Sequence, residues 1–208
     1  MKMIFLSAFR RGALPGLIAV AILAVQTTFF PAASPAAAKV TKDEGLAAFE
    51  TVRAVLQHPR CQNCHIPGDA PLQFDAGLVH GQNVVRGRIG MGAPGLPCST
   101  CHATANPPTS YGEHMPPGAP NWRLPPPERK MVFIHLSSGE LCRHLKDKAE
   151  NHNMDLEALL RHVASDKLVL WGWNPGVGRA PVSIPHEEFV AKFKTWIAAG
   201  APCAVAPR

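Results

Sequence analysis

The sequence has little of the positive charge that nucleic acid binding requires. Its formal net charge is +6, but the first 38 residues carry three basic and no acidic residues, so 18 basic against 15 acidic residues remain beyond them, or +3. That excess is too small to indicate a polyanion-binding surface. The chain also lacks the low hydrophobicity of a disordered protein, because 46% of its residues are hydrophobic. We therefore expect a globular protein with no nucleic acid partner.

The N-terminal segment has the pattern of an export signal. Basic residues precede an apolar run, residues 13–25, and three alanines at 36–38 form a small-residue cleavage pattern. We expect cleavage after Ala38 and export to the periplasm by the general secretion route. The alternative is an uncleaved membrane anchor, because residues 13–30 are nearly long enough to span a bilayer, but polar residues at 26–28 interrupt that run.

One five-residue motif, C-x-x-C-H, occurs twice, at residues 61–65 and 98–102. It is the pattern of covalent c-type haem attachment: two cysteines reach the two vinyl groups of a porphyrin, and the adjacent histidine becomes an axial iron ligand. The alternative is a zinc site built from two C-x-x-C pairs, but 33 residues separate the pairs, against about 15 to 20 in zinc ribbons. The sequence thus predicts two c-type haems, attached at Cys61, Cys64, Cys98 and Cys101, with His65 and His102 as iron ligands.

Helical patterns flank a region without them. A capping box at Thr41 and Glu44 begins a helix that Pro59 ends, and a second box at Ser137 and Glu140 begins another through Leu145. Apolar residues recur at helical spacing over residues 154–163, residues 168–173 form a short apolar run, and a last helix follows Pro185, with Gly200 and Pro202 beyond its end. We expect a mostly α protein whose C-terminal half, residues 128–208, is helical.

The region between the helical parts has the composition of loops. Residues 66–127 hold 12 of the 21 prolines and 9 of the 17 glycines. Because they also contain the second motif, we expect ordered loops over residues 58–127 that wrap around the haems. The motifs begin 37 residues apart, too close for two complete cytochrome domains. Beyond the signal peptide, 1–38, the chain should therefore form one compact multihaem domain, 39–208.

The ligand on the other face of each iron is less clearly marked. Our first choice is His80, which lies between the motifs beside a glycine that lets the backbone approach closely. The second choice is His114, with Met115 as its alternative, just before two prolines. Histidine lowers the reduction potential relative to methionine, so the choice affects the redox role. Further candidates are Met91, His58 and His162.

Two cysteines and three arginines complete the set of candidates. Cys142 and Cys203 lie outside both motifs, and in an exported protein we expect them to form a disulfide with each other. Arg86, Arg88 and Arg123 lie near the motifs in sequence and are candidates to pair with haem propionates.

The chain resembles periplasmic dihaem c-type cytochromes in its two motifs, its export signal and the loop that holds His80. Gly45 and Phe49 also resemble the G-x-x-x-aromatic pattern in the first helix of class I cytochromes c. The stretches at residues 58–72 and 117–122 are similar to uncharacterised bacterial cytochromes, some of them labelled as cytochrome subunits of isoquinoline 1-oxidoreductase-like enzymes.

The resemblance implies a periplasmic electron carrier that exchanges electrons with redox partner proteins. One alternative is a haem enzyme such as a peroxidase, which needs an open or displaceable axial position. Another is a dedicated cytochrome subunit of a larger oxidoreductase. Contact with a membrane is expected only if the N-terminal segment stays uncleaved.

Overall fold

A computed structural model describes residues 39–205 of the protein. The export signal and its cleavage point lie outside these residues. The regular structure of the described chain is helical, with few strands. Its helices are α1 (Lys42–Leu56), α2 (Pro59–Gln62), α3 (Ser138–Lys146), α4 (Leu156–Ser165), α5 (Lys167–Leu170) and α6 (His186–Ala198). The described residues form one compact unit.

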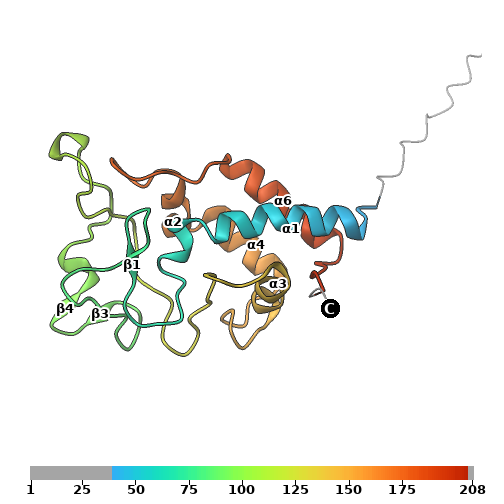
Figure 1. Cartoon of the computed structure of the whole chain (residues 1–208), viewed down its shortest axis with the longest axis horizontal. Coiled ribbons are helices and arrows are strands. Elements are labelled where there is room, and N and C mark those ends of the chain that lie inside the picture. Colours follow the sequence, from blue (N-terminus) through green and yellow to red (C-terminus); the bar gives the residue numbers. More distant parts are fainter. Residues whose placement is uncertain (1–38, 206–208) are drawn as a thin grey trace, which may run out of the picture. The chain divides into compact units, whose positions relative to one another are not determined.

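The first and last helices pack against each other through a close contact at Gly45 (Figure 1). A Cβ at Gly45 would lie 2.4 Å from the Cβ of Ala199, so only glycine permits this approach. One turn further along α1, Phe49 packs on Trp196 with ring centroids 4.9 Å apart. The predicted capping box begins α1: Thr41 accepts a hydrogen bond from the Glu44 amide, and the Glu44 carboxylate accepts one from the Thr41 amide.

The hydrophobic core lies among the four longer helices. Helix α1 contacts α3 and α6, and α4 also contacts α6. Helix α6 contributes Phe189, Phe193 and Trp196, which are fully buried. The capping box predicted at Ser137 begins α3. Other buried core residues are Val52, Leu141, Leu145, Leu159 and Val163.

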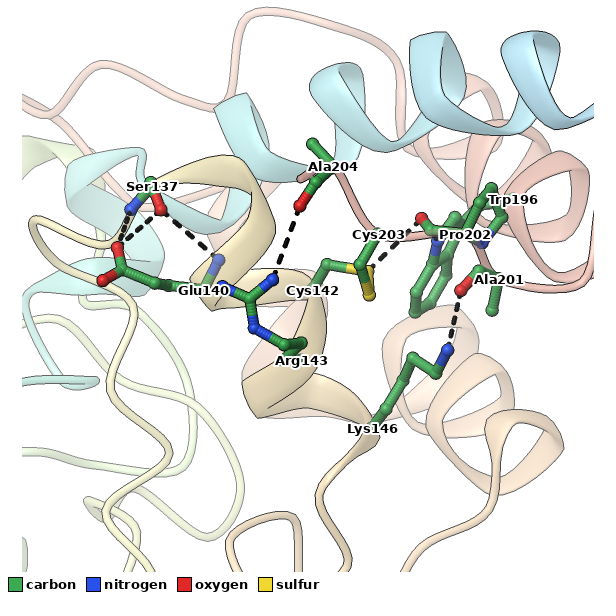
Figure 2. Close-up of a disulfide and its surroundings, with 10 residues drawn as sticks. All are labelled: Ser137, Glu140, Cys142, Arg143, Lys146, Trp196, Ala201, Pro202, Cys203 and Ala204. Atoms are coloured by element: carbon green, nitrogen blue, oxygen red, sulfur yellow. Dashed lines mark hydrogen bonds between the residues drawn. A yellow bond between two sulfur atoms is a disulfide. The ribbon is translucent and has the colours of Figure 1, made fainter. Parts of the chain in front are cut away.

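Cys142 and Cys203 form the predicted disulfide, with Cα atoms 5.4 Å apart (Figure 2). Around this bond, helix α3 holds the chain that follows α6. Lys146 Nζ donates to the carbonyl of Ala201 at 2.8 Å, and Trp196 Nε1 donates to the carbonyl of Pro202 at 3.0 Å. The C-terminal segment is thereby fixed to the helical core at several points.

The middle of the chain is irregular, as predicted, and lies beside the helices (Figure 1). It forms two short hairpins, one of β1 (Leu72–Gln73) with β2 (Leu78–Val79) and one of β3 (Gly92–Ala93) with β4 (Leu96–Pro97). Single 3-10 turns follow at η1 (Cys98–Thr100) and η2 (Thr109–Tyr111), and a third, η3 (Trp171–Trp173), extends α5.

Arg86 joins the loops to one another. Its side chain is 1% exposed, and its guanidinium donates to three backbone carbonyls, those of Ile66, Gly68 and Pro125. These hydrogen bonds connect segments up to 39 residues apart. Arg86 therefore holds the loops in place, and its donors are largely used for that purpose.

No helix within residues 39–205 is long and apolar enough to cross a membrane.

Candidate functional site

The first motif opens onto a large cavity between the loops and the helices. Helix α2 begins at Pro59, with the His58 side chain accepting from the Arg60 amide as its cap, and carries Cys61 in its short turn. Cys61, Cys64 and His65 line a cavity of about 910 Å³. Its other walls include Val55 and Leu56 of α1, Leu159 and Val163 of α4, and Phe189 and Phe193 of α6. The helical core thus gives the pocket beside Cys61 and Cys64 an apolar wall, which is common in small-molecule sites.

His65 is held in one orientation by two contacts. Its Nδ1 lies 2.7 Å from the carbonyl oxygen of Met131, and its ring stacks on Phe133 with centroids 3.9 Å apart. A backbone bond from the Phe133 amide to the His65 carbonyl, 2.9 Å, fixes this pairing. With Nδ1 donating to a carbonyl, the acceptor lone pair is on Nε2, which is the arrangement of a metal-ligating histidine. Burial lowers the pKa of His65 to about 4, so the ring is neutral near pH 7.

The second motif repeats this arrangement with different elements. His102 follows η1, and its Nδ1 lies 2.8 Å from the carbonyl oxygen of Pro117. Its ring stacks on Trp122, with centroids 4.4 Å apart and planes 8° from parallel. Burial lowers the pKa of His102 as well. Both motif histidines therefore have one nitrogen on a carbonyl and one face on an aromatic ring, which leaves Nε2 as the ligand atom.

His80 lies opposite His102. The hairpin of β1 and β2 leads into it, its amide donates to the Pro71 carbonyl at 2.9 Å, and its Nδ1 lies 2.9 Å from the Gly81 carbonyl. The centroids of the His80 and His102 rings are 6.2 Å apart. A metal between two imidazoles needs two metal–nitrogen bonds of about 2 Å each and about 1 Å from each nitrogen to its ring centre, or about 6 Å in all. The ring separation thus fits one iron held by both histidines.

Of the other predicted distal ligands, His162 alone lines the cavity at His65 within the described residues. His114 packs edge-on against Phe74, with centroids 5.4 Å apart, and does not line the cavity at His65. Met115 borders a separate small pocket near Arg179, which donates to its carbonyl at 2.7 Å. Met91 is exposed, and His58 caps α2. His162, in contrast, lines the cavity, as do His152 and Met154.

The cavity wall also carries positive charge. Arg88 and Arg123, two of the arginines predicted to pair with propionates, line it, and so does Arg60. Arg60 is buried and forms an ion pair with Asp75, and its guanidinium carbon lies 5.8 Å from the centroid of the Trp171 ring. A carboxylate-bearing cofactor would find guanidinium partners here. Arg86, the third arginine predicted to pair with a propionate, is not among the residues that line this cavity, and its guanidinium donates to backbone carbonyls.

Cys61 and Cys64 are buried thiols with raised pKa values. Burial, reinforced by the neighbouring Cys64, raises the pKa of Cys61 to about 12, and burial raises that of Cys64 to about 11. Within residues 39–205 the structure forms no group of three or more histidine, cysteine, aspartate or glutamate side chains that could hold a metal ion directly. The residues fit a porphyrin, whose own nitrogens supply four of the iron ligands.

Sequence reasoning missed the contacts that orient the two histidines. The carbonyl partner of His65 lies 66 residues further along the chain and that of His102 lies 15 residues further. Any residue can supply a carbonyl, so no sequence signal marks Met131 or Pro117. Phe133 and Trp122 are visible in the sequence as aromatic residues, but nothing there indicates which side chain each ring would stack on.

Comparisons with known proteins return no match: no protein-family model fits the chain, and no curated protein or solved structure is detectably similar to it.

Proposed function

We propose that the protein is an exported dihaem c-type cytochrome that transfers electrons between redox partner proteins. The observation that carries this proposal is the repeated arrangement of His65 and His102. Each directly follows a C-x-x-C pair, sets its Nδ1 on a backbone carbonyl at 2.7 or 2.8 Å, and stacks on an aromatic ring. In both histidines Nδ1 is therefore engaged, and Nε2 is the nitrogen that would bind iron.

Each motif would hold one haem. Cys61 and Cys64 would attach the first haem in the cavity of about 910 Å³, with His65 as its axial ligand. Cys98 and Cys101 would attach the second among the loops, with His102 and His80 as its axial ligands. Bound haem supplies an iron that changes its oxidation state by one electron.

The surroundings of the two sites support a relay between them. Trp122 stacks on His102 and also lines the cavity at His65, so one side chain touches both sites. Trp171 packs edge-on against Trp122 with centroids 4.9 Å apart and lines the same cavity. Leu159, Phe189 and Phe193 give the first site an apolar wall on its helical side. Ligands that are held in fixed orientations need little rearrangement when the charge on an iron changes, which suits electron transfer.

The test is a pyridine haemochrome assay on protein produced in a host with c-type haem attachment machinery. We expect two covalently bound haems per chain. One haem or none would overturn the dihaem proposal.

Carbon monoxide separates the carrier from the enzyme alternative, because six-coordinate ferrous haems bind it poorly. Ready binding, or turnover of peroxide, would favour the enzyme. Co-purification with a large catalytic subunit from the native host would indicate the subunit alternative.

A further inference from the structure

The iron that His65 would bind needs a second axial ligand, and the sequence leaves that ligand open. Four histidine or methionine side chains line the cavity apart from the motif itself. Met131 holds Nδ1 of His65 through its own carbonyl, which puts its backbone on the side of that ring away from Nε2. Three candidates therefore remain: His152, Met154 and His162. We propose that His162 of helix α4 is the distal ligand of the first haem, so that both haems have two histidine ligands. This inference rests on the proposed function.

Helix α4 places His162 at the cavity wall. Leu159 and Val163 of the same helix are buried in the core and also line the cavity, and α4 packs on α6. The His162 side chain is 41% exposed, so its removal leaves the packed core intact. A rigid helix therefore presents the ring to the pocket that begins at Cys61 and His65.

A carboxylate orients the His162 ring. Its Nδ1 lies 3.5 Å from Asp166 Oδ2. The other oxygen of the same carboxylate accepts from the amides of Leu168 at 2.8 Å and Val169 at 3.4 Å, where Asp166 caps α5. Asp166 is thus fixed at one oxygen and faces the imidazole with the other. A carboxylate on Nδ1 leaves Nε2 as the ligand atom and makes it a better electron donor to a metal.

The two competing side chains are engaged differently. The backbone of Met154 is held by Asn151, which donates to its carbonyl at 3.0 Å and accepts from its amide at 2.9 Å. Its side chain packs against the hydrophobic core. His152 lies in a turn and not on a helix, and both it and Asn153 have positive φ. Of the three candidates, His162 is the one whose ring faces a carboxylate within the described part of the chain.

Two histidines on each iron have a functional consequence. Neither iron keeps an open position for substrate, and both reduction potentials are lower than with a methionine ligand. The protein is then a carrier at the low end of the range of c-type cytochromes.

The test compares H162A with H152A and M154L, two variants of the same cavity wall, in the holoprotein. Low-temperature paramagnetic resonance and ultraviolet-visible spectra of the ferric state report the spin of each iron. In H162A we expect one of the two low-spin signals to be replaced by a high-spin signal, carbon monoxide to bind one ferrous haem per chain, and added imidazole to restore the low-spin signal. H152A and M154L should keep two low-spin irons.

Two low-spin irons in H162A would overturn the inference, as would a high-spin iron in H152A or M154L. If H162A is not recovered folded, near-infrared magnetic circular dichroism of the unaltered protein decides: two bis-imidazole bands are expected, and one imidazole–thioether band would overturn it. The haemochrome count on the same samples separates the two proposals. Fewer than two covalent haems in the unaltered protein contradicts the proposed function, whereas two haems with an unaffected H162A contradicts only the ligand assignment.

Discussion

The two C-x-x-C-H sites hold their histidines in the same way but within different kinds of structure. The pocket at His65 has walls from α1, α4 and α6 and a hydrophobic core directly behind it. His102 and His80 lie among turns and two-residue strands, with exposed Leu78 and Val79 beside His80. The comparison teaches that two motif histidines can be held in the same way although one borders a helical core and the other lies among loops. Only the helical site has apolar burial to support it without the cofactor.

The largest expected effect comes from removing each pair of attachment cysteines in turn. C98A with C101A should lose one haem and leave the helices folded, because the core does not include the second site. C61A with C64A should also lose one haem but leave the cavity of about 910 Å³ unfilled. We expect the unfolding midpoint to fall by about 10 °C or more, since 1 kcal/mol corresponds to about 2–4 °C in a domain of this size.

Thermal unfolding and amide hydrogen exchange measure this difference. In C98A with C101A, exchange should quicken within residues 66–127 and stay slow in α1 and α6. Equal destabilisation by the two double variants would show that the sites do not differ in their dependence on haem.

The disulfide should stabilise the helical side alone. Its cysteines are 61 residues apart in sequence, which corresponds to about 4 kcal/mol in the chain-entropy account. C142A with C203A should therefore lower the free energy of unfolding by about 2–4 kcal/mol in urea. The spectrum of both haems should stay as in the unaltered protein, and a changed spectrum at the His102 site would contradict the separation of the two regions.

A smaller effect is expected at the contact between α1 and α6. G45A would place its Cβ 2.4 Å from the Cβ of Ala199, and the resulting overpacking should cost about 1–3 kcal/mol of stability in urea. G95A is the matched control, because a Cβ there meets no atom within 4 Å. We expect its stability to stay within about 0.5 kcal/mol of the unaltered protein. A G45A protein of unaltered stability would mean that the helices approach less closely than described.

The smallest effect on stability is expected at His80. H80A should convert the iron at His102 to high spin while changing the free energy of unfolding by less than about 1 kcal/mol, because His80 lies in a loop outside the core. The ferric absorption spectrum and a urea titration measure the two quantities. H114A is the control, since its ring contacts Phe74, and should leave both irons low-spin. A high-spin iron in H114A and none in H80A would restore His114 as the ligand.

Sequence predicted the features that local chemistry determines. Thr41 with Glu44 and Ser137 with Glu140 mark helix starts because capping needs only four residues, and both helices begin there. The disulfide followed from the two cysteines outside the motifs. His80 lies with its ring centroid 6.2 Å from that of His102, and its role as a ligand stays a prediction.

What sequence could not predict depends on the path of the chain. The Met131 carbonyl reaches His65 only because Phe133 pairs with His65 through the backbone, and such pairing has no residue signature. His162 is one of several further candidates in the sequence, and its place on the cavity wall depends on the position of α4, which the sequence does not give. Arg86 was predicted to pair with a propionate because it lies near a motif in sequence. Its three carbonyl acceptors come from other loops, and sequence does not show that these loops meet at Arg86.

The most direct measurement of the central claim is mass spectrometry of the intact purified protein, followed by mapping of its peptides. The account predicts a mass larger than that of the processed chain by two haems, with one haem on the peptide that contains Cys61 and Cys64 and one on the peptide that contains Cys98 and Cys101. An unmodified mass after expression with active haem attachment, or free thiols on either peptide, would contradict it.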